Sequence, residues 1–291
     1  MSENKGYVIR TDSSSDIPEQ LLSEWGVYST SLTFRFSDSE NEYTNDGMNI
    51  KDFYAKMKAG GVAKTAAVNS ESFIKDFEPV LRDGYDILYL GFSSGLSTTY
   101  NSARIAAEQL KESYPERTII TVDTLCASAG GALLVNMVLA KKNAGATIEE
   151  AAAYAEERKL HICHWFTVDD LVYLKRGGRV SPTVAFVGNV LGIKPVMHVD
   201  NEGHLVKTGK VRGRKTSVMA LADKYGELHE EGDENKVYIS HSDCIADAEE
   251  LAGIIERKYG KKTELITDVG PVIGAHSGPG TLALFFVGKE R

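Results

Sequence analysis

Hydroxyl side chains that could hold an anion gather in residues 91–103, whose sequence is GFSSGLSTTYNSA. The apolar run before them, residues 85–90, predicts a buried strand of a parallel sheet, and residues 100–111 continue at helical spacing. We therefore expect the serines at the N-terminus of a helix, where free backbone N–H groups favour a carboxylate or a phosphate. Alternatively, one of these hydroxyl residues only caps the helix and the others are solvated: Ser93, Ser94, Ser97 and Thr98.

The same stretch contains a GxSxG pattern, formed by Gly91, Ser93 and Gly95. After a strand, this pattern is typical of the nucleophile turn of α/β-hydrolases, in which Ser93 would attack an acyl carbon. His276 as the base and Asp243 as the acid follow in the chain order that such enzymes use. However, no HGG-like oxyanion segment precedes Ser93, and three fixed positions in five form a weak signal. A serine hydrolase acting on an acyl ester is therefore the second hypothesis.

Length and charge limit the possible functions. With 291 residues, of which 42% are hydrophobic and 25% charged, the chain can form one large core or two. Its net charge of -8 argues against a nucleic-acid-binding protein, which needs a basic face. No apolar run approaches the roughly 20 residues of a membrane span, and residues 1–10 lack the apolar core of a signal peptide. We therefore expect a cytoplasmic protein.

The cysteines indicate a reducing environment. Cys126, Cys163 and Cys244 form no CxxC pair and lie among apolar or small residues. We expect reduced, partly buried thiols and no metal site.

The order of the predicted elements indicates an α/β protein with two domains. Strands and helices alternate up to residue 160, which predicts a parallel, layered α/β domain. Hydroxyl-rich turns follow Arg10, Leu90 and Val122, at the carboxyl ends of strands, where ligands collect in such sheets. Beyond that point a predicted hairpin precedes further strands and helices, which indicates an α+β domain with a mixed or antiparallel sheet. The predicted domains are 1–160 and 161–291.

Local patterns near these turns lead to further predictions. Residues 27–36 alternate as one strand, and Thr65 lies in a loop after a short helix. Gly130 and Gly131 lie inside a predicted helix, which suggests that something packs closely against its first turns. His276 lies in a predicted loop that contains four glycines and two prolines.

Several segments, in their order along the chain, resemble the DegV family of proteins. They are TDSSSDIP at residues 11–18, KT at 64–65, SSGLSTTYNSA at 93–103, LKRGGRVS at 174–181 and GAHSGPG at 274–280. The resemblance runs nearly end to end and is far more specific than GxSxG. It implies a two-domain α/β protein that holds one long-chain fatty acid, such as palmitate, stearate or oleate, between its domains.

The resemblance further implies a role as the fatty-acid-binding subunit of a bacterial fatty acid kinase. Such a subunit is not itself a complete enzyme, because it does not bind ATP. It also needs no cofactor. It presents the carboxyl group to a separate kinase protein, which makes the acyl phosphate. We expect a monomer that works with this partner.

Carried over by position, the head-group site of the family falls on Thr65, Ser94, Ser97 and His276. Hydroxyl donors, helix N-terminal amides and an imidazole can together orient a carboxylate so that one oxygen faces a phosphoryl donor. At least one of the two serines is also expected to cap the following helix.

Four arginines stand out in this acidic chain, each close to a glycine: Arg176, Arg179, Arg212 and Arg214. The resemblance makes Arg212 or its neighbours a docking point for the kinase or for the transferred phosphate. The alternative is that these side chains are solvated and have no specific role. In either case we expect Arg212 and Arg214 to reach solvent.

Overall fold

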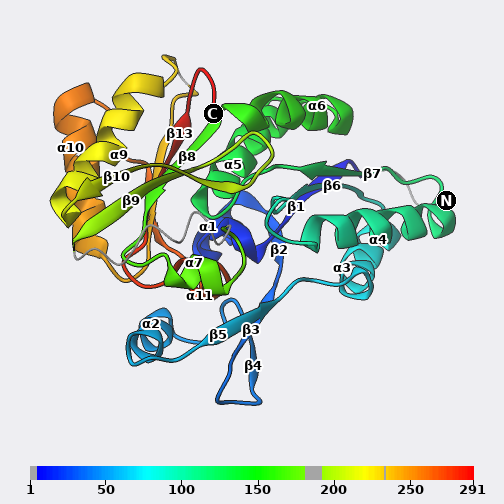
Figure 1. Cartoon of the computed structure of the whole chain (residues 1–291). Coiled ribbons are helices and arrows are strands. Elements are labelled where there is room, and N and C mark those ends of the chain that lie inside the picture. The colour runs from blue at the N-terminus through cyan, green and yellow to red at the C-terminus, as the bar shows by residue number, and fades with distance from the viewer. Residues whose placement is uncertain (1–4, 181–191, 233) are drawn as a thin grey trace.

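The computed structural model describes residues 5–180, 192–232 and 234–291. Within these ranges the chain forms three sheets with helices packed on them (Figure 1). No helix in these ranges is long and apolar enough to cross a membrane.

The first sheet has four parallel strands in the order β2-β1-β6-β7. Their bounds are Tyr7–Asp12 (β1), Tyr28–Thr30 (β2), Asp86–Gly91 (β6) and Ile119–Asp123 (β7). The accompanying helices are η1 (Ser13–Ser15), α1 (Glu19–Trp25), α3 (Ser70–Arg82), α4 (Thr99–Ser113), α5 (Ala129–Asn143), α6 (Ile148–Arg158) and η2 (Lys159–His161).

Strand β6 is buried along its whole length because helices cover both faces of the first sheet. Ile87 and Tyr89 lie in a hydrophobic cluster with residues of α3 and α4. Leu88 and Leu90, which point to the opposite face, lie in a cluster with residues of α5 and α6. This burial on two sides explains the continuous apolar run that predicted a parallel strand.

The second sheet has six strands in the order β10-β9-β8-β13-β11-β12. Only β11 and β12 pair in parallel, so the sheet is mixed, as predicted. Helices α9 and α10 pack on one face. The bounds are β8 (Ile162–Thr167), α7 (Val172–Arg176), β9 (Ile193–Val199), β10 (Leu205–Arg212), α9 (Arg214–Leu228), β11 (Val237–His241), α10 (Ile245–Tyr259), β12 (Leu265–Asp268) and β13 (Leu282–Val287).

Helix α5 lies between the two larger sheets and contacts strands of both. Its residues are buried on nearly all sides, which is why it lacks a polar face. A side chain at Gly130 would come within 2.1 Å of His164 Nε2, and one at Gly131 would meet Ser15 at 3.4 Å. The predicted close packing is confirmed at Gly130, whereas Gly131 has ordinary contact distances.

A third, antiparallel sheet of three strands forms a separate lobe with helix α2 (Figure 1). Its elements are β3 (Thr33–Phe36), β4 (Glu42–Thr44), α2 (Ile50–Lys58) and β5 (Ala63–Ala66). The single strand predicted at residues 27–36 is therefore wrong, since β2 and β3 belong to different sheets. The chain turns between them at Leu32, whose N–H donates to Ser13 Oγ. Thr65, predicted in a loop, lies in strand β5.

The glycine-rich segment before the last strand is a helix rather than the predicted loop. Helix α11 spans Pro271–Ser277, with proline in its first turn, where the missing N–H costs no hydrogen bond. Gly278, with a φ of 79°, ends it. His276 therefore projects from the last turn of a short helix.

Candidate functional site

A cavity of about 390 Å³ lies between turns at the carboxyl ends of strands of the first sheet and one face of the second sheet. Phe92 and Leu96, from the turn between β6 and α4, line it on one side. Phe166 and Phe285, from β8 and β13, line it on the other. Because these elements come from distant parts of the sequence, only the folded chain creates the cavity.

Alternate residues of β13 form part of the apolar wall of the cavity. Ala283 and Phe285 line it, as does Thr281 just before the strand, and Phe166 and His164 lie opposite Ala283 and Phe285 on β8. Directly opposed residues of an antiparallel pair point to the same face, which explains the continuous surface. His164 is neutral there, since burial lowers its pKa well below the ordinary value. This wall suits a hydrocarbon chain.

One end of the cavity is polar and brings together Thr65 and His276. The Thr65 hydroxyl lies 2.8 Å from His276 Nε2. His276 Nδ1 faces Gly177, where a side chain would approach within 2.1 Å, so glycine at this position makes room for the imidazole. Burial, and then the charge of Arg179, lower the pKa of His276 to about 4. The imidazole is therefore neutral at pH 7.

Arg179 lies at the same end of the cavity. Its Nε donates to the carbonyl of Leu96 at 3.1 Å, and a second nitrogen donates to the carbonyl of Gly177. Among the residues that the structure describes, no carboxylate forms an ion pair with this guanidinium. The side chain is half-buried, and this partial loss of hydration lowers the pKa of Arg179. A half-buried cation without an acidic partner is a favourable site for an anionic group.

The two predicted serines also line the cavity, but in different states. Ser97 Oγ accepts the N–H of Thr99, the first residue of α4, at 3.2 Å and lies 2.9 Å from the Thr99 hydroxyl, while the N-cap residue Thr98 makes no side-chain cap hydrogen bond. Ser94 is exposed, and its backbone N–H donates to Asp123. We call Thr65, Ser94, Ser97, Arg179 and His276 the head-group cluster.

The catalytic arrangement of a serine hydrolase is absent from the described part of the chain. Ser93 is fully buried, and its hydroxyl donates to the carbonyl of Gly203 at 2.9 Å. Asp243 pairs with Lys58 in another cavity, and His276 bonds to Thr65. The proposed nucleophile, base and acid therefore do not meet, and the prediction of a hydrolase triad is wrong in its geometry.

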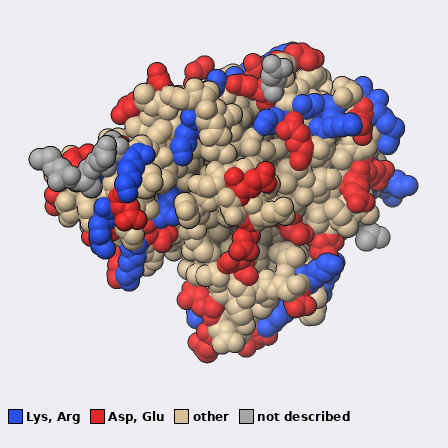
Figure 2. Space-filling model, turned by 180° about the vertical axis from the view of Figure 1, so that it is seen from behind, with Lys and Arg blue, Asp and Glu red and all other residues tan. Residues whose placement is uncertain are grey.

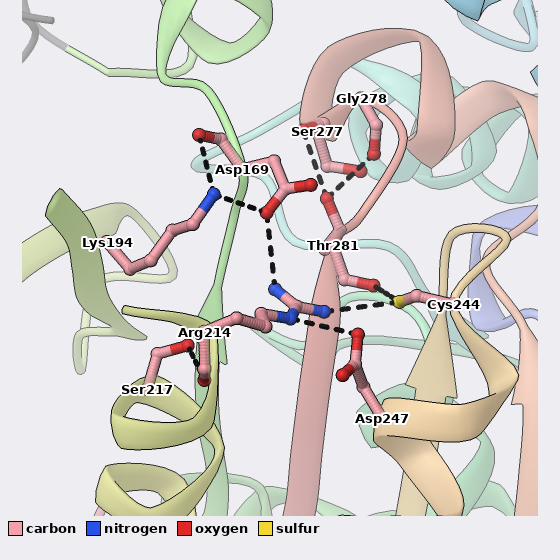
Figure 3. Close-up of polar contacts among 9 residues, drawn as sticks. All are labelled: Asp169, Lys194, Arg214, Ser217, Cys244, Asp247, Ser277, Gly278 and Thr281. Carbon is pink, nitrogen blue, oxygen red and sulfur yellow. Dashed lines mark hydrogen bonds and ion pairs between the residues drawn. The ribbon is translucent and has the colours of Figure 1, made fainter. Parts of the chain in front are cut away.

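The other three arginines lie outside the cavity. Arg212 is exposed at the end of β10, as predicted, and Arg176 is exposed over the ring of Tyr173 at 5.6 Å. The prediction that Arg214 reaches solvent freely is wrong, because this side chain is held among Asp169, Asp247 and Cys244 (Figure 3). Arg214 is the first residue of α9, and its side chain turns inward to these groups.

The surface carries charges of both signs. On the face shown in Figure 2, Lys and Arg are scattered among Asp and Glu and form no broad basic surface. Within residues 5–180, 192–232 and 234–291, no group of three or more His, Cys, Asp or Glu side chains is placed to hold a metal ion.

Known proteins with the same architecture share sequence with this chain. A family model described as "uncharacterised protein, DegV family" matches residues 7–289. The chain belongs to the DegV family. A DegV domain-containing protein of Clostridium perfringens is 42% identical over 288 residues, which cover 99% of each chain. A Thermotoga maritima protein named fatty acid-binding protein is 34% identical, over 97% of this chain and 98% of that one.

Solved structures agree with this assignment. A DegV lipid binding protein from Thermotoga maritima superimposes with a TM-score of 0.87 at 32% identity, covering 98% of this chain and 99% of that one. The predicted DegV-like α/β fold, a parallel sheet with helices plus a mixed sheet, is therefore confirmed.

Two features of this DegV chain escaped the sequence analysis. The first is the position of the β9–β10 hairpin, whose Val199 and Leu205 line the cavity. Its turn contacts the first sheet, because Gly203 accepts the Ser93 hydrogen bond and a side chain at Gly95 would meet the Glu202 carbonyl at 2.8 Å. An antiparallel hairpin was predicted here, but nothing local in its sequence indicates that its turn crosses to another sheet.

The second feature is a buried polar chain beside the cavity. Ser128 and Ser240 both line the cavity, their hydroxyls lie 3.0 Å apart, and Ser128 donates to Asp16. Asp16 also accepts the N–H of Gly270 at 3.0 Å, next to the start of α11. Burial raises the pKa of Asp16 to about 7. The DSSSD segment, which is not part of the cavity lining, therefore joins the first sheet to the second.

Proposed function

We propose that this DegV chain binds one long-chain fatty acid, with its hydrocarbon tail on the apolar wall and its carboxylate at the head-group cluster. The observation that carries the proposal is the cavity itself, apolar along β13 and ending at Arg179, Thr65 and neutral His276. Relatives named as fatty acid-binding and lipid binding proteins support it. The ligand would lie between segments 1–160 and 161–291, which we propose as the two domains.

Most of the affinity is expected to come from the tail. Burying one methylene contributes about 0.8 kcal/mol, so about 15 methylenes contribute on the order of 12 kcal/mol before the cost of association. Palmitate, stearate and oleate are ligands of this class. The head-group cluster then decides which way round the ligand enters and how its carboxylate is oriented.

The geometry of the polar end favours presentation of the carboxylate to a second protein. Arg179 supplies a charge, and Thr65 with the neutral imidazole of His276 supplies further hydrogen bonds, so one carboxylate oxygen can be held firmly. Ser94 and Thr98, which line the cavity, are exposed, which leaves the cavity open toward solvent. We infer that a separate ATP-dependent kinase phosphorylates the free oxygen there, and that this chain alone is not an enzyme.

Docking of such a kinase is assigned to the exposed arginines. Arg212 ends β10 and Arg176 ends α7, and both are exposed cations on an acidic protein. An exposed cation suits an acidic surface of a partner or the charge that builds up on a phosphoryl group. Arg214, held by its own ion pairs, is not available for this role.

Native mass spectrometry of protein purified from bacteria tests the binding proposal. We expect a retained mass of palmitate, stearate or oleate, and Thr65→Ala should lower retention only about threefold, since it removes one hydrogen bond while the tail remains buried. An empty protein after mild purification would contradict fatty-acid binding.

On the same preparations, Arg212→Ala should keep its lipid but lose most acyl-phosphate formation with a cognate kinase and ATP. The exposed neighbour Lys215→Ala is the matched control, and equal transfer rates for both variants would remove Arg212 from the docking site.

A further inference from the structure

A second cavity, of about 570 Å³, lies next to the loop that follows α11 and is lined largely by charged residues. Its cations already have acidic partners. Lys58 pairs with Asp243, Lys194 lies 2.6 Å from Asp169, and Arg214 lies 2.9 Å from Asp247. Because these charges neutralise each other, the cluster has little attraction for an external anion. The charged cluster is therefore better explained by the neighbouring segments of the chain that it holds in place.

Arg214 makes one contact that leads out of this cluster (Figure 3). Its Nη2 donates to Cys244 Sγ at 3.3 Å, and Cys244 Sγ lies 3.2 Å from the carbonyl oxygen of Thr281. Burial raises the pKa of the Cys244 thiol to about 11, so the sulfur keeps its proton and can donate it to that carbonyl. A continuous line of hydrogen bonds thus joins the guanidinium to the start of β13.

Thr281 carries this line to the helix that bears His276. The Thr281 hydroxyl lies 3.0 Å from the carbonyl of Ser277 and 2.9 Å from that of Gly278, at the C-terminus of α11 (Figure 3). These are carbonyls that a helix end leaves without partners. With seven residues, α11 is too short to be stable alone, so its last turn depends on such contacts.

The same loop is held from its other side by Asp169. A side chain at Gly280 would come within 2.2 Å of Asp169 Oδ2, so the loop backbone packs directly against this carboxylate. Asp169 is in turn 3.6 Å from Arg214 Nη1 and 2.6 Å from Lys194. Arg214 therefore contacts groups on both sides of residues 278–281, Asp169 on one side and Cys244 on the other.

We propose that Arg214 is a positioning residue, which fixes residues 278–281 through Asp169 and Cys244 and thereby sets His276 against Thr65 for the bound carboxylate. The inference rests on the proposed function, because it assigns a ligand to the head-group cluster. Arg214 never touches that ligand. It acts on the orientation of the His276 imidazole. His276 directly precedes Ser277, whose carbonyl accepts the hydrogen bond of the Thr281 hydroxyl.

The test uses the full chain loaded with palmitate that carries ¹³C at its carboxyl carbon. The NMR resonance of that carbon is titrated with pH for the wild type, Arg214→Lys, Cys244→Ala and Cys244→Ser. Lysine keeps the charge but cannot contact both Asp169 and Cys244 in the fork geometry of a guanidinium. For Arg214→Lys and Cys244→Ala we expect the titration midpoint to rise toward that of the free acid by about one pH unit, because donors to the carboxylate are displaced.

Two comparisons separate positioning from a general loss of structure. Cys244→Ser keeps an acceptor for Arg214 and a donor for Thr281, so it should restore most of the wild-type midpoint. Lys58→Ala, in the same cavity but without a hydrogen bond to residues 278–281, should leave the midpoint unchanged. Palmitate affinity at neutral pH should fall by about tenfold in Arg214→Lys and Cys244→Ala, because a one-unit rise of the bound carboxyl midpoint weakens binding of the ionised form by that factor, and should stay unchanged in Lys58→Ala.

Either of two results would overturn the proposal. One is an unchanged carboxyl midpoint in Cys244→Ala and Arg214→Lys with palmitate bound. The other is a midpoint that moves as far in Lys58→Ala as in Cys244→Ala. A wild-type chain that takes up no palmitate is a separate outcome, because it contradicts fatty-acid binding itself.

Discussion

Two turns of the first sheet have nearly the same composition but different surroundings. Both lie at the carboxyl end of a parallel strand, and both are rich in serine and threonine: residues 11–15, which span the end of β1 and η1, and residues 92–98 after β6. None of residues 11–15 lines the cavity of the head-group cluster, whereas six of residues 92–98 do. A hydroxyl-rich turn at the carboxyl end of a strand is therefore not sufficient to form a ligand site.

The difference lies in the charged groups that accompany each turn. In the first turn the Ser14 hydroxyl donates to the Asp12 carboxylate and the Ser15 hydroxyl to the Asp12 backbone carbonyl, so both hydroxyl donors are occupied inside the protein. The second turn contains no acid, and its Leu96 carbonyl is bonded by Arg179. An internal carboxylate occupies hydroxyl donors, while a neighbouring cation leaves them available for an anionic ligand.

The first turn nevertheless supports the second. Asp12 Oδ2 accepts the Tyr89 hydroxyl at 2.6 Å and the N–H of Phe92 at 2.9 Å. It therefore fixes the end of β6 and the first residue of the second turn. The internal turn is the scaffold, and the cavity-lining turn is the site that it supports.

The largest expected effect concerns Asp16, at the end of the acidic turn. Its folded-state pKa is about 7, above the ordinary value of 3.8, so the folded protein holds this proton more tightly than the unfolded chain does. Stability should therefore fall as pH rises from about 4 to about 7, by on the order of 4 kcal/mol, and then level off. Asp16→Asn should lose this part of the pH dependence. Urea unfolding at a series of pH values would measure it, and parallel curves for the two proteins would show that Asp16 does not titrate in this range.

A smaller effect is expected from the cation beside the second turn. Arg179→Ala should weaken palmitate binding about tenfold, because it removes a charge-assisted hydrogen bond from a partly desolvated site. Arg176→Ala is the matched control, three residues earlier but exposed, and should change affinity less than about twofold. Competition with a fluorescent fatty acid would give both values. Equal losses in the two variants would mean that long-range charge, rather than contact at the head-group cluster, is responsible.

Sequence patterns predicted the features that depend on local spacing. The apolar run of β6 and the small residues of α5 gave the central strand and the tightly packed helix. The prediction of a loop around His276 was wrong, because glycine and proline do not only break helices. Proline is common in the first turn of a helix, as at Pro271, and glycine is common directly after the last turn, as at Gly278. Arg179 was assigned to docking because its position beside His276 depends on contacts between residues almost 100 positions apart.

The smallest expected effect concerns Ser93, which tests whether the second turn contains a nucleophile. An activated serine must lie within hydrogen-bond reach of a base, whereas the Ser93 hydroxyl donates to the Gly203 carbonyl and accepts the N–H of Gly95 at 3.2 Å. We expect no labelling by a fluorophosphonate probe. Ser93→Ala should lower stability by about 1 kcal/mol, since it leaves a buried carbonyl of the β9–β10 turn without its donor. Ser94→Ala, at the exposed neighbour, should change stability by less than about 0.5 kcal/mol. Stoichiometric labelling that disappears in Ser93→Ala would restore the hydrolase hypothesis, because it would require Ser93 to leave Gly203 and meet a base.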